Sequence, residues 1–95
     1  MNMHFTHTKV RVSPNALIQE LNGEAVLLDL DSEVYFGLDE VGTEMWSALN
    51  STPTVDQAWQ SLCFRFDTTP ETLMADLDSF VVELVKLGLL QDDAA

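Results

Sequence analysis

The spacing of apolar residues changes abruptly at Asp39, and this change limits the folds that the chain can adopt. Before Asp39 the apolar residues mostly alternate with polar ones, as in strands with one buried face. Beyond it they recur every third or fourth residue, as on one side of a helix. Strands followed by helices in a chain of 95 residues predict a single α+β domain.

The alternating part predicts three antiparallel strands. They cover residues 9–21, with an interruption at Ser13-Pro14-Asn15, residues 25–30 and residues 33–37. Asn22-Gly23 predicts a two-residue hairpin turn, because both central residues of a type I′ turn need a positive φ. The side chains expected to face inward from the second and third strands are Val26, Leu28, Leu30, Val34, Phe36 and Leu38. The third strand directly precedes the helices and is therefore expected at an edge of the sheet.

Three helices are predicted from the second part of the chain. Asp39 is a capping residue for the first helix, and Thr54 with Gln57 has the spacing of a capping box for the second. The third helix opens with Pro70 at its first position and is closed by Gly88.

Charge and composition restrict the partners of this domain. Sixteen acidic and four basic side chains give a formal net charge of −12, which disfavours nucleic acids and anionic membranes and favours basic partners. Cys63 is the single cysteine, which excludes an internal disulfide and fits a reducing cytoplasm. No apolar run approaches the ~20 residues that span a bilayer, and residues 1–8 lack the features of a signal peptide. We therefore expect a cytoplasmic protein with a disordered tail over residues 1–8 and a frayed acidic tail over residues 91–95.

The third helix carries more apolar surface than one buried face requires. A stripe expected to face the core consists of Leu73, Leu77, Phe80, Leu84 and Leu87. The apolar surface is extended well beyond the usual ~100° by Met74, Val81, Val82 and Val85. Either the sheet or the N-terminal segment covers this flank, or the flank and the last strand bound a groove for an extended peptide. A peptide in such a groove would pair with an open strand edge, and residues 34–37 contain neither the Lys nor the Pro that often protects an edge.

An ordered set of short segments resembles the PqqD-like family. The segments are Pro14-Asn15, the strand from Gly23 to Asp31, Tyr35-Phe36-Gly37-Leu38 leading to Gly42 and Trp46, Thr54-Val55, and Asp76 with Leu87-Gly88-Leu89-Leu90. The resemblance extends from Val10 to Leu90 and places a PqqD-like domain at residues 9–90. It implies a winged helix-turn-helix fold with a three-stranded antiparallel sheet followed by three helices.

The resemblance also implies a non-catalytic function in the biosynthesis of modified peptides. The leader segment of a ribosomally made precursor peptide would be held as an added strand against the third strand and the third helix. It would then be presented to a modifying enzyme or leader protease, as in lasso-peptide or quinone-cofactor biosynthesis. Carried onto this sequence, the peptide-binding residues are Val34, Tyr35, Phe36, Met74, Asp78, Val81, Val82 and Val85. No catalytic residue, metal or cofactor is implied.

Two residues depart from the family pattern. Many members have Gly at the position of Glu33, and this difference leaves the turn type open, because Gly tolerates a positive φ more readily. Asp39 stands where Asn is common, and both residues cap helices well.

Other functions remain as alternatives at this point. A winged helix suggests DNA binding, but the third helix presents Glu71, Asp76 and Asp78 before its first basic residue, Lys86, so it cannot neutralise phosphates. A structural module that dimerises through the same edge strand is a further possibility.

Enzymatic functions have weaker support. His4 and His7 have a spacing compatible with a metal on a helix, but they lack a third ligand. Cys63 lies on the apolar stripe of the second helix, as a buried structural thiol would.

Overall fold

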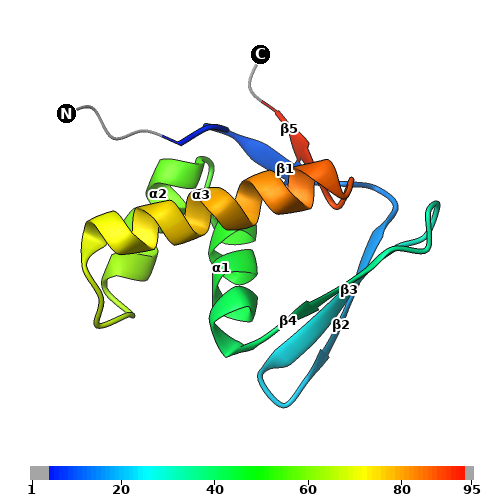
Figure 1. The fold of residues 1–95 in the computed structure, drawn as a ribbon, viewed down its shortest axis with the longest axis horizontal. Coiled ribbons are helices and arrows are strands. Elements are labelled where there is room, and N and C mark those ends of the chain that lie inside the picture. The colour runs from blue at the N-terminus through cyan, green and yellow to red at the C-terminus, as the bar shows by residue number, and fades with distance from the viewer. Residues whose placement is uncertain (1–4, 94–95) are drawn as a thin grey trace.

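The computed structural model describes residues 5–93, and it consists of two small antiparallel sheets and three helices. Figure 1 shows α3 crossing the molecule above α1, with the larger sheet below one end of α3. In chain order the elements are β1 (Val10–Val12), β2 (Ala16–Leu21), β3 (Glu24–Asp29), β4 (Tyr35–Leu38), α1 (Glu40–Ser51), α2 (Val55–Cys63), α3 (Pro70–Lys86) and β5 (Leu90–Asp92). The predicted α+β fold, a three-stranded antiparallel sheet followed by three helices, is confirmed.

The strand order of the larger sheet is β2-β3-β4, so β4 lies at an edge as predicted. Asn22 and Gly23 have φ angles of 54° and 82°, which confirms the hairpin turn with two positive φ values. This turn fixes the register of β2 and β3, in which Leu27 lies opposite Ile18. On its other side Leu27 lies opposite Phe36 of β4.

The prediction of the inward face of β3 is wrong. Ala25 and Leu27 are buried, whereas Val26 and Leu30 are exposed. Apolar residues occupy both faces of this strand, so alternation alone did not decide which face meets the helices. The prediction for β4 is correct, since Leu38 is buried and Phe36 is half-buried.

The helices begin where the sequence predicts. The Asp39 carboxylate accepts a hydrogen bond from the Gly42 N–H (2.8 Å), and Thr54 Oγ1 accepts one from the Gln57 N–H (3.1 Å). Helix α3 begins at Pro70 and ends before Gly88, whose φ is 79°.

Both chain ends of the described region pack on the domain, in contrast to the predicted tails. Phe5 is buried in the core and contacts Trp59 edge to face. Residues 90–92 form β5, which pairs with β1, and the Asp93 N–H donates to the Lys9 C=O (2.8 Å). The expected tails are therefore wrong for residues 5–8 and 91–93, while residues 1–4, including His4, and 94–95 lie outside the described region.

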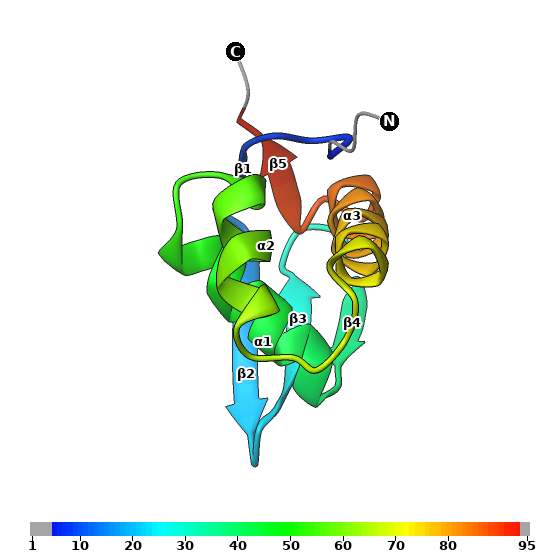
Figure 2. The same ribbon diagram turned by 90° about the vertical axis from the view of Figure 1, so that its left-hand side faces the viewer.

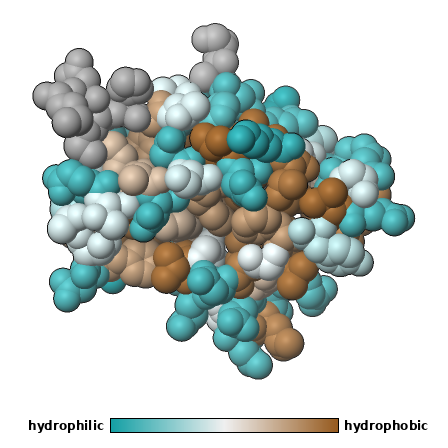
Figure 3. Space-filling view, in the orientation of Figure 1, coloured by the Kyte–Doolittle hydropathy of each residue, from teal (hydrophilic) through white to brown (hydrophobic). Residues whose placement is uncertain are grey.

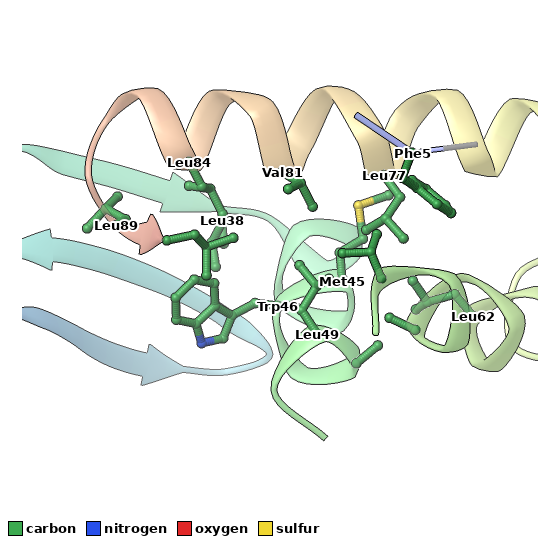
Figure 4. Packing of buried hydrophobic residues seen from close by; sticks show 14 of the residues in the cluster. Phe5, Leu38, Met45, Trp46, Leu49, Leu62, Leu77, Val81, Leu84 and Leu89 are labelled. Carbon is green, nitrogen blue, oxygen red and sulfur yellow. The ribbon is translucent and has the colours of Figure 1, made fainter. Parts of the chain in front are cut away.

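The core lies between α3, α1, α2 and the inner face of the sheet. Its fully buried members include Leu27, Leu62, Leu77, Leu84 and Leu89. Figure 4 shows side chains from α3 pointing toward Trp46 and Met45 of α1. Among residues 5–93, no helix is long and apolar enough to cross a membrane.

Candidate functional site at the free edge of strand β4

Strand β4 pairs with β3 on one side only. Within residues 5–93, no strand pairs with its other edge. Figure 2 shows β4 as the outermost strand on the side of the sheet that lies nearest to α3. The N-terminal segment from Phe5 onward does not occupy this edge, because it packs on α2, α3 and β5 instead.

The main-chain groups that face the free edge belong to Tyr35 and Gly37. The Asp29 N–H donates to the Val34 C=O (2.9 Å), so the polar groups of Val34 point toward β3. Because these groups alternate in direction along an antiparallel strand, those of Phe36 also face β3, and those of Tyr35 and Gly37 face outward. An extended chain placed here would find an unused donor and acceptor on each of these two residues.

A hollow lies between this edge and α3. The rings of Phe36 and Phe80 meet edge to face, with centroids 6.4 Å apart and an interplanar angle of 71°. The hollow has a volume of about 290 Å³ and is lined by Phe36, Gly37, Leu38, Asp39, Gly42 and Phe80. A Cβ atom at Gly42 would come within 3.3 Å of Leu38 and Asp39, so the missing side chain lets α1 begin directly beneath β4.

Phe80 identifies the flank of α3 that faces β4. Asp76 precedes it by four residues, and Glu83 and Leu87 follow by three and seven, so all lie on the same side of the helix. One turn before Phe80 this flank borders a second hollow of about 260 Å³, whose lining includes Asp76, Val41 and Phe66. The β4 flank thus combines aromatic and aliphatic side chains with carboxylates.

Most of the predicted α3 residues lie elsewhere. Met74 and Val81 are buried, with exposed fractions of 7% and 0%, and Figure 4 shows Val81 pointing into the core. They cannot line an open groove, because other core side chains already surround them.

Asp78 lies on the opposite flank of α3 from Phe80. Its carboxylate accepts hydrogen bonds from the Thr6 N–H (2.7 Å) and from Thr6 Oγ1 (2.9 Å). Val82 and Val85 follow Asp78 by four and seven residues, so they share its side and point away from β4. The alternative that the N-terminal segment covers this flank is therefore correct beside Asp78.

The structure thus places Val34, Tyr35 and Phe36 together at the edge of β4. The predicted helix residues lie in the core or on the opposite flank of α3. Phe80 was assigned to the core stripe, although it is only half-buried. Its position at the margin of that stripe, next to Asp76 and Glu83, was the available signal that it borders a surface hollow.

The loop before β4 is held by a buried carboxylate. Asp29 accepts hydrogen bonds from the Asp31 N–H (3.1 Å) and from the Ser32 hydroxyl (2.8 Å). Glu33 adopts a φ of 60° in this loop, a conformation that Gly adopts more readily than a residue with a side chain. Asp29 and Glu33 therefore shape the entry into β4.

The edge offers main-chain bonds and an apolar hollow rather than reactive groups. Within residues 5–93 there is no group of three or more His, Cys, Asp or Glu side chains that could hold a metal ion. Cys63 is half-buried on α2, away from β4.

Comparisons with known proteins identify a family and similar folds. Residues 24–90 match the family described as Coenzyme PQQ synthesis protein D (PqqD). The fold is similar to that of TbiB1 in complex with the TbiA(beta) leader peptide, with a TM-score of 0.81, 29% identity, and coverage of 90% of this chain and 99% of that chain. It is also similar to lasso peptide synthetase B1 complexed with the leader peptide, with a TM-score of 0.77, 20% identity, and coverage of 86% and 96%. No curated protein sequence matches the chain.

Proposed function

Because the chain belongs to the PqqD family, we propose that it binds the leader segment of a ribosomally made precursor peptide as an added strand on β4. It then presents this segment to a modifying enzyme or leader protease. The free edge of β4, with Tyr35 and Gly37 facing outward beside a hollow, is the observation that carries the proposal. The likeness to TbiB1, which is in complex with a leader peptide, supports it further.

In strand addition, main-chain hydrogen bonds provide affinity and side-chain contacts provide selectivity. The leader pairs with the main chain of Tyr35 and Gly37, and each such bond contributes about 1 kcal/mol whatever the leader sequence. Side chains of a strand alternate between two faces, so every second leader residue points toward Phe36, Phe80 and α3. An apolar leader side chain that fills the hollow there supplies the selectivity.

Carboxylates around the hollow favour a leader with basic residues. Asp39 lines the hollow itself, Asp76 lines the neighbouring one, and Glu83 is exposed on the same flank of α3. Their charges attract Lys or Arg side chains at the ends of the apolar stretch. The role is non-catalytic, because strand addition requires no reacting side chain.

DNA binding has less support. Two of the four basic side chains, Arg65 and Arg11, form ion pairs with Glu44 and Asp93. The exposed surface of α3 carries Glu71, Asp76 and Glu83, which repel phosphates.

Amide hydrogen exchange tests the proposal. A synthetic leader from a candidate precursor peptide is added, and exchange of each amide is followed by NMR. We expect new protection at Tyr35 and Gly37 and none at Ile18 and Glu20, whose N–H groups face the free edge of β2. Binding of the leader without protection at Tyr35 and Gly37 would refute strand addition at β4.

A further inference from the structure

The face of the β2-β3-β4 sheet that points away from the helices is apolar and uncovered by residues 5–93. Five of the large apolar side chains that are exposed belong to this outer face or to its continuation past β3: Leu17, Leu21, Val26, Leu30 and Tyr35. In the register of the sheet, Leu28 lies between Leu17 and Tyr35, and Val26 lies beside Gly37. Figure 3 shows hydrophobic surface in its lower right part, where Figure 1 places this sheet.

The outer face is hollowed at Gly37. No atom lies within 4 Å of the position that a Cβ of Gly37 would occupy, so this residue leaves its neighbour Val26 uncovered. A hollow of about 480 Å³ borders this place, and its lining includes Leu21, Val26 and Gly37. A protruding apolar side chain of a partner would fit there.

The charges around the outer face have one sign. Glu24 lies at the hairpin end of the sheet, and Asp31 and Glu33 lie at the other end, all of them exposed. None of the residues of β2, β3 and β4 is Lys or Arg. The outer face is therefore a largely apolar surface, with the uncharged Gln19 beside Val26, between two acidic ends.

We propose that this outer face, formed by Leu17, Leu21, Val26, Leu28 and Tyr35, docks the processing enzyme that receives the bound peptide. This inference rests on the proposed function, because Tyr35 joins the outer face to the edge that takes the leader. A leader strand added to β4 extends the sheet, so its outward side chains continue the same surface. The enzyme surface that fits is apolar and ringed by Lys and Arg.

A second copy of the chain does not fit this face. Face-to-face pairing would bring the acidic ends of two outer faces together, each on a chain with a net charge of −12. An enzyme surface that is ringed by Lys and Arg is instead attracted by the same carboxylates.

Charge substitution separates this surface from the leader site. The modifying enzyme or leader protease of the same pathway is purified and titrated against Leu17→Glu and Val26→Glu, which lie on β2 and β3, two strands and one strand away from the free edge of β4. We expect at least tenfold weaker enzyme binding, with leader affinity unchanged within twofold. Phe64→Glu is the matched control, because Phe64 is 92% exposed at the end of α2 and gains the same charge, and it should change neither affinity. If a Glu variant fails to fold, Val26→Thr keeps the strand and the shape while removing apolar surface, and at least threefold weaker enzyme binding is expected.

The other outcomes overturn either the docking surface or the proposed function. Enzyme binding that is absent from the unaltered protein, or that persists in both Glu variants, shows that the enzyme does not dock here. Parallel loss of leader affinity would assign these residues to the peptide site, and light scattering that reveals a dimer dissolved by Leu17→Glu would assign the face to a second copy. If the unaltered protein binds the enzyme but no leader, while Leu17→Glu binds neither, the docking surface stands and the proposed function falls.

Discussion

The three-stranded sheet has two free edges, and each lies beside a helix and a hollow. The hollow between β2 and α1 has a volume of about 460 Å³, and half of its lining is polar, from Glu20, Ser47, Asn50 and Ser51. The hollow between β4 and α3 is smaller, about 290 Å³, but two aromatic rings, Phe36 and Phe80, meet across it. The larger hollow therefore lies at the β2 edge, so size does not favour β4. The difference is that two aromatic residues, Phe36 and Phe80, line the β4 hollow, whereas the lining of the β2 hollow includes one, Trp46, which is only 7% exposed. A guest strand at β4 therefore buries its side chains against more aromatic surface while it completes the ladder.

The largest effect is expected from a substitution that removes a main-chain hydrogen bond between β4 and the leader. Tyr35→Pro removes the N–H that faces the free edge, and we expect leader affinity to fall about 30-fold, or about 2 kcal/mol. Glu20→Pro is the matched change on the other edge. The Leu30 N–H donates to the Asn15 C=O (2.9 Å), so by alternation the N–H of Glu20 faces the free edge of β2.

Calorimetric titration measures both variants. Glu20→Pro should bind the leader within twofold of the unaltered protein, and Tyr35→Ala, which keeps the N–H, should lose less affinity than Tyr35→Pro. A larger loss in Glu20→Pro would move the site to β2.

A smaller effect is expected when an aromatic ring beside the β4 edge is removed and the main-chain pairing of β4 is kept. Phe80→Ala takes away the ring that meets Phe36, and we expect about tenfold weaker leader binding, or about 1.4 kcal/mol. Val82→Ala, on the opposite flank of α3, should leave leader affinity unchanged within twofold. Fluorescence anisotropy with a labelled leader measures both, with thermal melting as a check on folding. Equal losses would place the leader across both flanks of α3 and would restore Val82 to the site.

Much of the fold was predictable because local signals agreed. The turn at Asn22-Gly23, the cap at Asp39 and the opening of α3 at Pro70 each depend on a few neighbouring residues, and all three appear in the structure. The inward face of β3 was not predictable, because apolar residues occupy both of its faces and only contact with the helices decides between them. The pairing of β5 with β1 was missed for a related reason, since two three-residue strands far apart in sequence carry little local signal.

The edge strand of the proposed site was predictable from the sequence, whereas the flank of α3 that faces this strand was not. An edge strand without Lys or Pro can be read directly from Val34-Tyr35-Phe36. The flank of α3 that meets β4 depends on how the helix is rotated, which the packing of the whole core decides. The contact of Phe36 with Phe80 and that of Thr6 with Asp78 fix this rotation.

Charge should make a modest contribution at the β4 edge and none at the β2 edge. Glu83→Gln removes an exposed carboxylate from the flank of Phe80, and we expect about twofold weaker binding of a basic leader at low salt. Affinity measured between about 50 and 300 mM salt should fall less steeply for this variant than for the unaltered protein, because salt screens the missing attraction. Glu20→Gln is the matched control and should keep the original slope. Equal slopes in all three proteins would show that Glu83 does not attract the leader.

The smallest effect concerns two connections of the sheet, the turn that follows β2 and the loop that precedes β4. The β2–β3 turn places Gly23 at a φ of 82°, whereas the loop before β4 places Glu33 at a φ of 60°. A side chain at this positive φ costs about 1 kcal/mol, and Glu33→Gly removes that cost. Gly also makes the unfolded chain more flexible, so only part of this free energy is gained. We expect a net gain of about 0.5 kcal/mol in the free energy of unfolding, or about 3 °C in Tm, with leader affinity unchanged. Gly23→Ala should act in the opposite direction, since it adds a side chain at a positive φ. A lower Tm for Glu33→Gly would mean that the Glu33 side chain stabilises the entry to β4 by more than its backbone strain costs.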